Sequence, residues 1–264
     1  MMISHTFAIC AYKESEYLEE CIVSLINQTV KTNIILATST PNDYIEGLCN
    51  KYSITMYVNT GESGITQDWN FAYSKADTEY VTIAHQDDVY SDVYVENLEL
   101  MMQKAKKPII FFTDYYEVRN GQKVFDNKLL KVKKLMLLPL RIKLFHNSRF
   151  VRRRILSLGC AICCPSVTFV RNNCPDVIFA HGFRSVEDWE AWEKLSKLKG
   201  AFVYCHKPLM GHRIHEDSET SKIILDSARQ EENYIIFRKF WPAPIARLLN
   251  SFYKKSEDSN NLNS

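Results

Sequence analysis

The first 113 residues alternate short apolar runs with segments of helical periodicity, and this alternation restricts the possible folds more than any other feature. Apolar runs typical of buried strands fall at 6–11, 34–37, 54–58, 80–84 and 108–113. Helices are expected between them, at 17–26, 43–52, 66–76 and 92–104. This repetition predicts an α/β fold, a mostly parallel sheet with helices on both faces. Such sheets bind ligands at the carboxyl ends of their strands.

The pattern changes after residue 113, although no linker separates the two halves. Asn120-Gly121 indicates a two-residue hairpin turn. Further elements are expected as strands at 165–171 and 201–205, and as helices at 186–197 and 223–240, the last ended by Pro242 and Pro244. We therefore expect one domain with a ligand-binding half at 1–118, a second half at 119–240, and a partly disordered tail at 241–264.

The sharpest local motif is His85-Gln86-Asp87-Asp88, directly after the apolar run 80–84. Two adjacent carboxylates at a strand end repel each other unless a cation lies between them or one is protonated. Hard oxygen ligands suit Mg²⁺ or Mn²⁺, which proteins often share with substrate phosphates. The alternative is a surface turn that caps the helix starting near Asp92.

A longer set of motifs resembles family 2 of the GT-A glycosyltransferases. The opening of that family is similar to Ala8-Ile9-Cys10-Ala11-Tyr12-Lys13-Glu14 followed by Leu18 to Leu25 and Gln28-Thr29. Its next block resembles Gly64, Trp69-Asn70, Ala76 and Glu79-Tyr80, and its acidic metal motif coincides with Gln86-Asp87-Asp88. The resemblance covers about residues 6–118 well and the second half thinly. It implies a GT-A fold, a nucleoside diphosphate sugar as donor, and Mn²⁺ or Mg²⁺ as cofactor.

The resemblance also assigns roles to individual residues. It implies that Asp88 and His215 hold the metal and that the donor contacts are Cys10, Tyr12, Ser39, Asn70, Asp87 and Arg213. Two departures concern the donor: the family usually has Asn where this chain has Lys13, and an acidic pair where it has Ala37 to Asp43. The alternative for the stretch after His215, residues 216–220, is a solvated polar loop.

A second acidic pair, Glu187-Asp188, opens the helix expected at 186–197. A similar pair in the family supplies the general base, so the resemblance implies that Asp188, or else Glu187, removes the acceptor's proton in an inverting transfer. The alternative is that both acids only complement the helix dipole.

A basic segment at 128–154 contains ten lysines and arginines and no acid, so the rest of the chain has 23 basic and 31 acidic side chains. Leucines alternate with these charges, which indicates an anionic membrane surface as partner. The alternative is a solvated helix face packed on the core. Nucleic acid is disfavoured, because no nucleic-acid-binding motif accompanies the charge.

The sequence shows no targeting signal, and we expect a cytoplasmic protein. If the basic segment binds lipid, the protein is expected to be peripheral on the inner leaflet. The chain begins without the pattern of a signal peptide, and no run approaches about 18 apolar residues. The eight cysteines are then expected to be reduced core residues. A zinc site around Cys160 and Cys163 is disfavoured, because a second close pair of ligands at standard spacing is missing.

The preferred function is an inverting sugar transfer to a glycan or lipid-linked acceptor, in polysaccharide or glycoconjugate synthesis. Dinucleotide-dependent oxidoreductases and P-loop enzymes are excluded, because residues 10–15 lack their glycine-rich patterns. The alternatives are a sugar nucleotidylyltransferase, or an inactive protein that binds carbohydrate or nucleotide.

Overall fold

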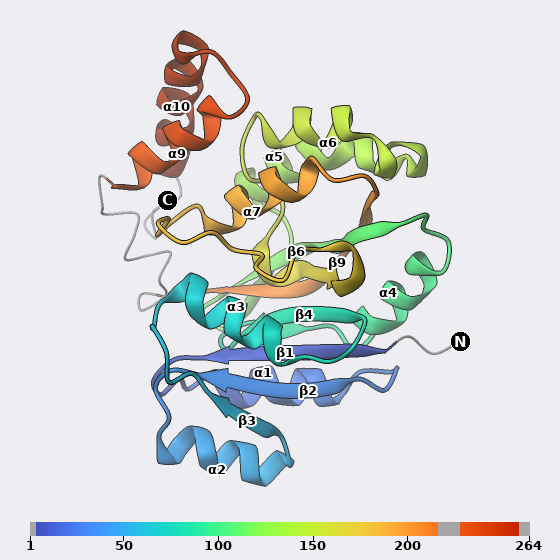
Figure 1. Cartoon of the computed structure of the whole chain (residues 1–264), viewed down its shortest axis with the longest axis vertical. Coiled ribbons are helices and arrows are strands. Elements are labelled where there is room, and N and C mark those ends of the chain that lie inside the picture. The colour runs from blue at the N-terminus through green and yellow to red at the C-terminus, as the bar shows by residue number, and fades with distance from the viewer. Residues whose placement is uncertain (1–3, 216–227, 259–264) are drawn as a thin grey trace.

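The structure, a computed structural model, describes residues 4–215 and 228–258, and within these ranges a single nine-stranded sheet organises the chain (Figure 1). The strand order is β3-β2-β1-β4-β8-β6-β9-β5, with β7 paired to β6. The strands are β1 His5–Ala11, β2 Asn33–Thr38, β3 Thr55–Val58, β4 Tyr80–His85, β5 Val89–Tyr90, β6 Pro108–Arg119, β7 Gln122–Val124, β8 Val167–Val170 and β9 Ala201–Ile214.

Helices cover both faces of the sheet, as the alternation predicts. The α-helices are α1 Leu18–Ile26, α2 Asp43–Tyr52, α3 Ile65–Lys75, α4 Tyr94–Met102, α5 Lys128–Leu137, α6 Arg149–Leu156, α7 Glu187–Ser196, α9 Ala228–Arg238 and α10 Ala243–Asp258. Along β1, Phe7 and Ile9 belong to the core that contains residues of α1, α2 and α4. Ala8 points the other way, into the core shared with α3, α6 and α7.

The first four strands of the order are parallel, and their pairing sets the position of the site. Cys10 pairs with Ala37 of β2 on one side and with His85 of β4 on the other. The carboxyl ends of these strands therefore meet at one edge of the sheet. Beyond β4 the sheet is mixed: β8 is antiparallel to β4 and β6, whereas β6 and β9 are parallel.

The predicted hairpin is confirmed at the β6–β7 connection. Arg119 pairs with Gln122, and Asn120 and Gly121 both have positive φ, 49° and 76°. A two-residue turn between right-twisted strands requires this backbone conformation.

Helix α2 spans the predicted residues 43–52, whereas strands β6 and β9 and the region around Pro244 differ from the sequence prediction. Helix α2 is capped by Asn42, whose Oδ1 accepts a hydrogen bond of 3.0 Å from the amide of Ile45. Strands β6 and β9 are longer than expected, because each continues along the other past two irregularities near Asp114. Pro242 follows α9, but Pro244 lies in the first turn of α10, where its missing amide hydrogen costs little.

Helix α10 occupies most of the region that the sequence indicated as a tail. The start of the helix expected at 223–240, the polar loop at 216–220 and residues 259–264 lie outside the described residues. In the ranges that are described, no helix combines the length and apolar character needed to cross a bilayer.

Candidate active site

A cleft of 1640 Å³ opens at the carboxyl ends of β1 and β4, the edge at which a parallel sheet is expected to bind ligands. Its walls come from segments far apart in the chain, namely 10–17, 63–69, 85–87, 160–165, 182–189 and 212–215. Seven of the ten predicted site residues line it; the other three, Ser39, Asn70 and the fully buried Asp88, lie behind its wall.

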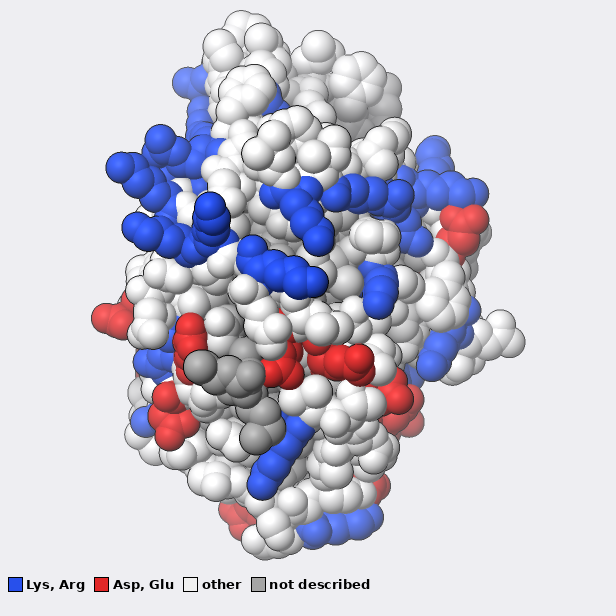
Figure 2. Space-filling view, turned by 90° about the vertical axis from the view of Figure 1, so that its right-hand side faces the viewer, with Lys and Arg blue, Asp and Glu red and all other residues white. Residues whose placement is uncertain are grey.

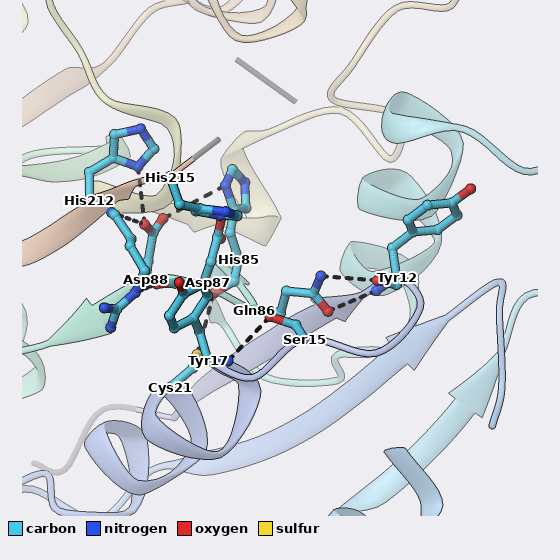
Figure 3. A network of polar contacts seen from close by, with 11 residues as sticks. Tyr12, Ser15, Tyr17, Cys21, His85, Gln86, Asp87, Asp88, His212 and His215 are labelled. Carbon is cyan, nitrogen blue, oxygen red and sulfur yellow. Dashed lines mark hydrogen bonds and ion pairs between the residues drawn. The ribbon is translucent and has the colours of Figure 1, made fainter. Parts of the chain in front are cut away.

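The centre of the cleft is an acidic group at the end of β4 (Figure 3). His85, Asp87 and Asp88 each offer one ligand atom, and these atoms lie within 4.8 Å of one another. Asp88 is fully buried, and its Oδ1 accepts hydrogen bonds from Nδ1 of His212 (3.0 Å) and the amide of Arg213 (2.9 Å).

The other oxygen of Asp88, Oδ2, has no hydrogen-bond partner among the described residues, and Nδ1 of His85 lies 3.8 Å from it. A buried carboxylate oxygen without a partner is costly unless something completes its coordination. Burial also lowers the pKa of His85, which keeps its imidazole neutral and able to bind a metal. These donors fit a small divalent cation.

The end of β9 brings two predicted residues to this acidic group. Nε2 of His215 lies 3.0 Å from Oδ2 of Asp87, and Nε of Arg213 donates to the carbonyl of Asp87 at 2.8 Å. Burial alone would raise the pKa of Asp87, but the hydrogen bond from His215 and the nearby histidines hold it below its ordinary value. His215 thus contacts Asp87, and His85 is the histidine grouped with both carboxylates.

Arg213 is held from several directions and fixes the loop that follows β1. Its guanidinium lies over the ring of Tyr17, 4.3 Å from the centroid, and pairs with Glu20 of α1. It therefore orders the cleft wall while lining the cleft itself.

Cys10 and Tyr12, the predicted donor contacts at the end of β1, both line the cleft. The backbone of Tyr12 is bonded in both directions to Gln86, whose Oε1 accepts at 2.9 Å and whose Nε2 donates at 3.0 Å (Figure 3). Lys13 has a φ of 55°, in the left-handed region that Asn tolerates better than Lys. This backbone conformation gives a physical reason for the Asn that the family has there.

Ser39 and Asn70 do not line the cleft, and their role as donor contacts stays a prediction. Ser39 donates to Oδ2 of Asp68 at 2.7 Å, and Asp68 lines the cleft in its place. Both polar atoms of the Asn70 side chain bond the backbone of Ile178 and Phe179. Asn70 therefore ties α3 to a distant loop, which explains why this position suits an amide.

The predicted acidic pair lies in the first turn of α7, and both members line the cleft. Oδ2 of Asp188 accepts a hydrogen bond of 3.4 Å from the thiol of Cys160, and Oδ1 accepts one of 2.6 Å from the amide of Trp189. Burial raises the pKa of Asp188. Burial also raises the pKa of Glu187 to about 7, and its Oε1 has no hydrogen-bond partner in the described part of the chain.

The sequence prediction assigned no role to four residues of this cleft: His85, Asp68, Cys160 and Lys133. His85 and Asp68 were detectable, because each lies within a motif that was already singled out. Cys160 and Lys133 come close to Asp188 from segments whose sequences contain no pattern that indicates this proximity. Only the fold shows it.

The basic segment divides into structural and exposed cations. Arg152 is buried and donates to the carbonyls of Ser196, Leu198 and Gly200, whereas Arg153 pairs with Glu193 at 2.9 Å. Other cations remain at the surface, where Figure 2 shows lysines and arginines gathered in a band across the upper half of one face. The exposed members of the segment are Lys128, Lys131, Arg141, Lys143, Arg149 and Arg154.

Comparisons with known proteins agree with the resemblance. The sequence profile of the family described as "Glycosyl transferase family 2" matches residues 6–173. A fragment of TarS from S. aureus, in complex with UDP-GlcNAc, is similar with a TM-score of 0.62 and 16% identity, over 98% of this chain and 73% of that one. A comparison with curated protein sequences finds no match.

Two other solved structures are similar. A mannosyltransferase from Pyrobaculum calidifontis, in complex with GDP-Man and Mn²⁺, has a TM-score of 0.61 and 12% identity, over 98% of this chain and 74% of that one. Glucosyl-3-phosphoglycerate synthase from Mycobacterium tuberculosis, in complex with UDP, has a TM-score of 0.57 and 13% identity, over 90% of this chain and 80% of that one. The expected GT-A fold is confirmed.

Proposed function

The chain belongs to glycosyl transferase family 2, and on that premise we propose that it is a metal-dependent, inverting glycosyltransferase that uses a nucleoside diphosphate sugar. The family match and the GT-A fold support the sugar-transfer class. The observation that carries the metal dependence is the buried Asp88, whose Oδ2 faces His85 and has no hydrogen-bond partner within residues 4–215 and 228–258. The similar mannosyltransferase was solved with Mn²⁺ and GDP-Man.

We assign the metal to Asp88, with Asp87 and His85 completing the group. Bound Mn²⁺ or Mg²⁺ would neutralise the charge that develops on the departing diphosphate, so no protein acid is needed there. His212 and the amide of Arg213 hold Oδ1 of Asp88 and thereby aim Oδ2. His215 holds Asp87 in the same way.

We assign the general base to Asp188, and Glu187 is the weaker candidate. The base must take the proton of the acceptor hydroxyl while that oxygen attacks the anomeric carbon. Arg229 of α9 interacts with both acids, but the charge of Asp188 also reaches His85 of the metal group, whereas Glu187 interacts with Glu232 of α9. Asp188 is thus the acid directed toward the donor, and Glu187 is a buried neighbour.

The decisive experiment is incubation of the purified protein with a panel of nucleotide sugars and Mn²⁺. Released nucleoside diphosphate with a product of inverted anomeric configuration supports the proposal, and a retained configuration contradicts the inverting mechanism. Release of pyrophosphate from sugar 1-phosphate and nucleoside triphosphate would instead identify a nucleotidylyltransferase. Binding without turnover of any donor would identify an inactive binding protein.

We further propose that the acceptor is a glycan or lipid-linked glycan, in polysaccharide or glycoconjugate synthesis, and that the protein meets the inner leaflet from the cytoplasm. Exposed apolar side chains of the basic segment support this, since Leu144 is 80% and Phe150 73% exposed beside Lys143 and Arg149. On α10, Leu248 and Phe252 are also exposed. Cations next to exposed apolar side chains are typical of a surface that docks on anionic lipid.

A further inference from the structure

Lys133 is the cation of the basic segment that lines the cleft. It lies on α5, and its Nζ is 5.1 Å from the centroid of the Tyr115 ring, with a hydrogen bond to that side chain. Four other members of the segment have structural partners: Lys131 pairs with Asp126, Lys134 donates to a backbone carbonyl, and Arg152 and Arg153 hold the end of α7.

Lys133 forms no ion pair with a carboxylate in the part of the chain that the structure describes. Its neighbours in the cleft are the Tyr115 ring and the thiols of Cys160 and Cys163. Lys133 is half-buried, and a cation partly withdrawn from water is stabilised when an anion compensates it. The cleft itself is where that anion can enter.

The electrostatic reach of Lys133 places it between the two halves of the candidate active site. Its charge lowers the pKa of Asp188, the proposed base, and that of His212, which bonds Oδ1 of Asp88. An anion bound by Lys133 would therefore lie near Asp188, at the proposed site of sugar transfer. Ammonium groups bind phosphate as compact point charges.

We propose that Lys133 binds a phosphate group of a substrate within this cleft. The inference deepens the proposed function and rests on it for the identity of that substrate. Two sources share this chemistry: the diphosphate of the donor and a phosphate carried by the acceptor. In the first case the ammonium stabilises the charge that develops on the leaving group. In the second it positions the acceptor hydroxyl beside Asp188.

The test compares Lys133→Met, Lys133→Arg and the neighbouring Lys134→Met as control, all checked for unchanged thermal unfolding. Titration calorimetry with pyrophosphate and with UDP and GDP, each with Mn²⁺, measures the phosphate contact. Loss of Lys133 should weaken the binding of these anions by about 10- to 100-fold, the usual range for a charge-assisted hydrogen bond. Lys133→Arg should keep most of the affinity, and uridine or guanosine without phosphate should bind all proteins equally.

The outcomes distinguish the sources and the premise. If Lys133→Met keeps nucleoside diphosphate affinity but raises the KM of the acceptor and abolishes inhibition by inorganic phosphate, the phosphate belongs to the acceptor. If anion affinity, phosphate inhibition and both KM values are unchanged, the proposal is wrong. Pyrophosphate binding that depends on Lys133 would support the phosphate site even if the protein transfers no sugar. Failure of the phosphate proposal and failure of the proposed function can therefore be told apart.

Discussion

Cys160 donates a hydrogen bond from its thiol to Oδ2 of Asp188, at 3.4 Å. Burial raises the pKa of Cys160, so the thiol keeps its proton at neutral pH and remains a donor. A donor stabilises the carboxylate form of Asp188 and lowers its pKa, against the burial that raises it. The thiol is thus a positioning group for the proposed base.

This contact predicts a change in the pH profile. Because Asp188 acts as base only when ionised and its pKa is raised, activity should fall on acidification at a higher pH than for an exposed aspartate. Cys160→Ala removes a group that lowers this pKa, so the acid limb of kcat/KM should move to higher pH. Cys160→Ser keeps a donor and should restore the limb. Superimposable profiles for the three proteins would show that the thiol has no such role.

Asp88→Asn tests the metal site with almost no change in shape. The amide oxygen of Asn can still accept the bonds from His212 and the amide of Arg213, but the charge and the free carboxylate oxygen are lost. We expect turnover to fall by at least about 10³-fold and Mn²⁺-dependent nucleotide binding to weaken, measured by product release and calorimetry. Asp114→Asn, a buried acid bonded to Tyr204, is the control. Near-normal activity of Asp88→Asn, or insensitivity to chelator, would rule out the metal role.

Glu187 should make the wild-type protein less stable as the pH rises, and Glu187→Gln should lack this pH dependence. Its pKa is about 7 in the folded protein, above the ordinary value of 4.5, so its contribution is complete below about pH 4.5 and lost as the pH rises through about 7. The shift corresponds to roughly 3 kcal/mol. Glu187→Gln should therefore unfold about 5–10 °C above wild type at pH 8 and at the same temperature at pH 4.5. Equal melting temperatures at both pH values, as expected for exposed Glu62→Gln, would contradict this.

The parallel half of the fold was predictable because each of its strands and helices has a hydrophobic pattern of its own in the sequence. Strand β1 and helix α1 have their own apolar periods, and the order of strands and helices places their carboxyl ends together. The acidic motif 85–88 then falls at this edge without further information. The lengths of β6 and β9 were not predictable, because each strand extends along its partner and not along a pattern of its own.

The limits of prediction in the site have the same origin. His212 reaches Asp88, and Cys160 reaches Asp188, across 124 and 28 residues of chain. No local pattern encodes such a contact. In the basic segment, the charge of a residue did not reveal whether its side chain is exposed. The composition of the segment indicated a surface, but Arg152 is buried.

Arg152→Met should destabilise the fold. Arg152 is 1% exposed and donates to three carbonyls, so its loss takes this partner from the buried Ser196 and from the more exposed Leu198 and Gly200. Each unsatisfied carbonyl costs about 1–3 kcal/mol, and we expect a total loss of at least about 3 kcal/mol in urea denaturation. Exposed Lys143→Met should change stability by less than about 0.5 kcal/mol. Equal losses in the two variants would mean that Arg152 is not structural.

The proposed docking on anionic lipid should depend on the exposed members of the basic segment and not on the buried Arg152. The cationic variant changes Lys128, Lys143 and Arg149 to Gln, and the apolar variant changes Leu144 and Phe150 to Ser. Each lysine or arginine near such a surface contributes about 1 kcal/mol, so the cationic variant should lose on the order of 100-fold in affinity.

Co-sedimentation with liposomes of graded anionic lipid content measures this affinity at low and high salt. Wild-type binding should rise with anionic lipid and fall as salt shortens the Debye length from about 10 Å at 0.1 M to about 3 Å at 1 M.

The control variant changes Lys31, Lys51 and Lys75 of the half at 1–118 to Gln, which removes the same charge from another surface. If it loses as much affinity as the cationic variant, attraction comes from net charge alone. The apolar variant should weaken binding even at high salt, because insertion of Leu144 and Phe150 is not screened. Binding that ignores lipid charge, salt and all of these residues would remove the membrane proposal.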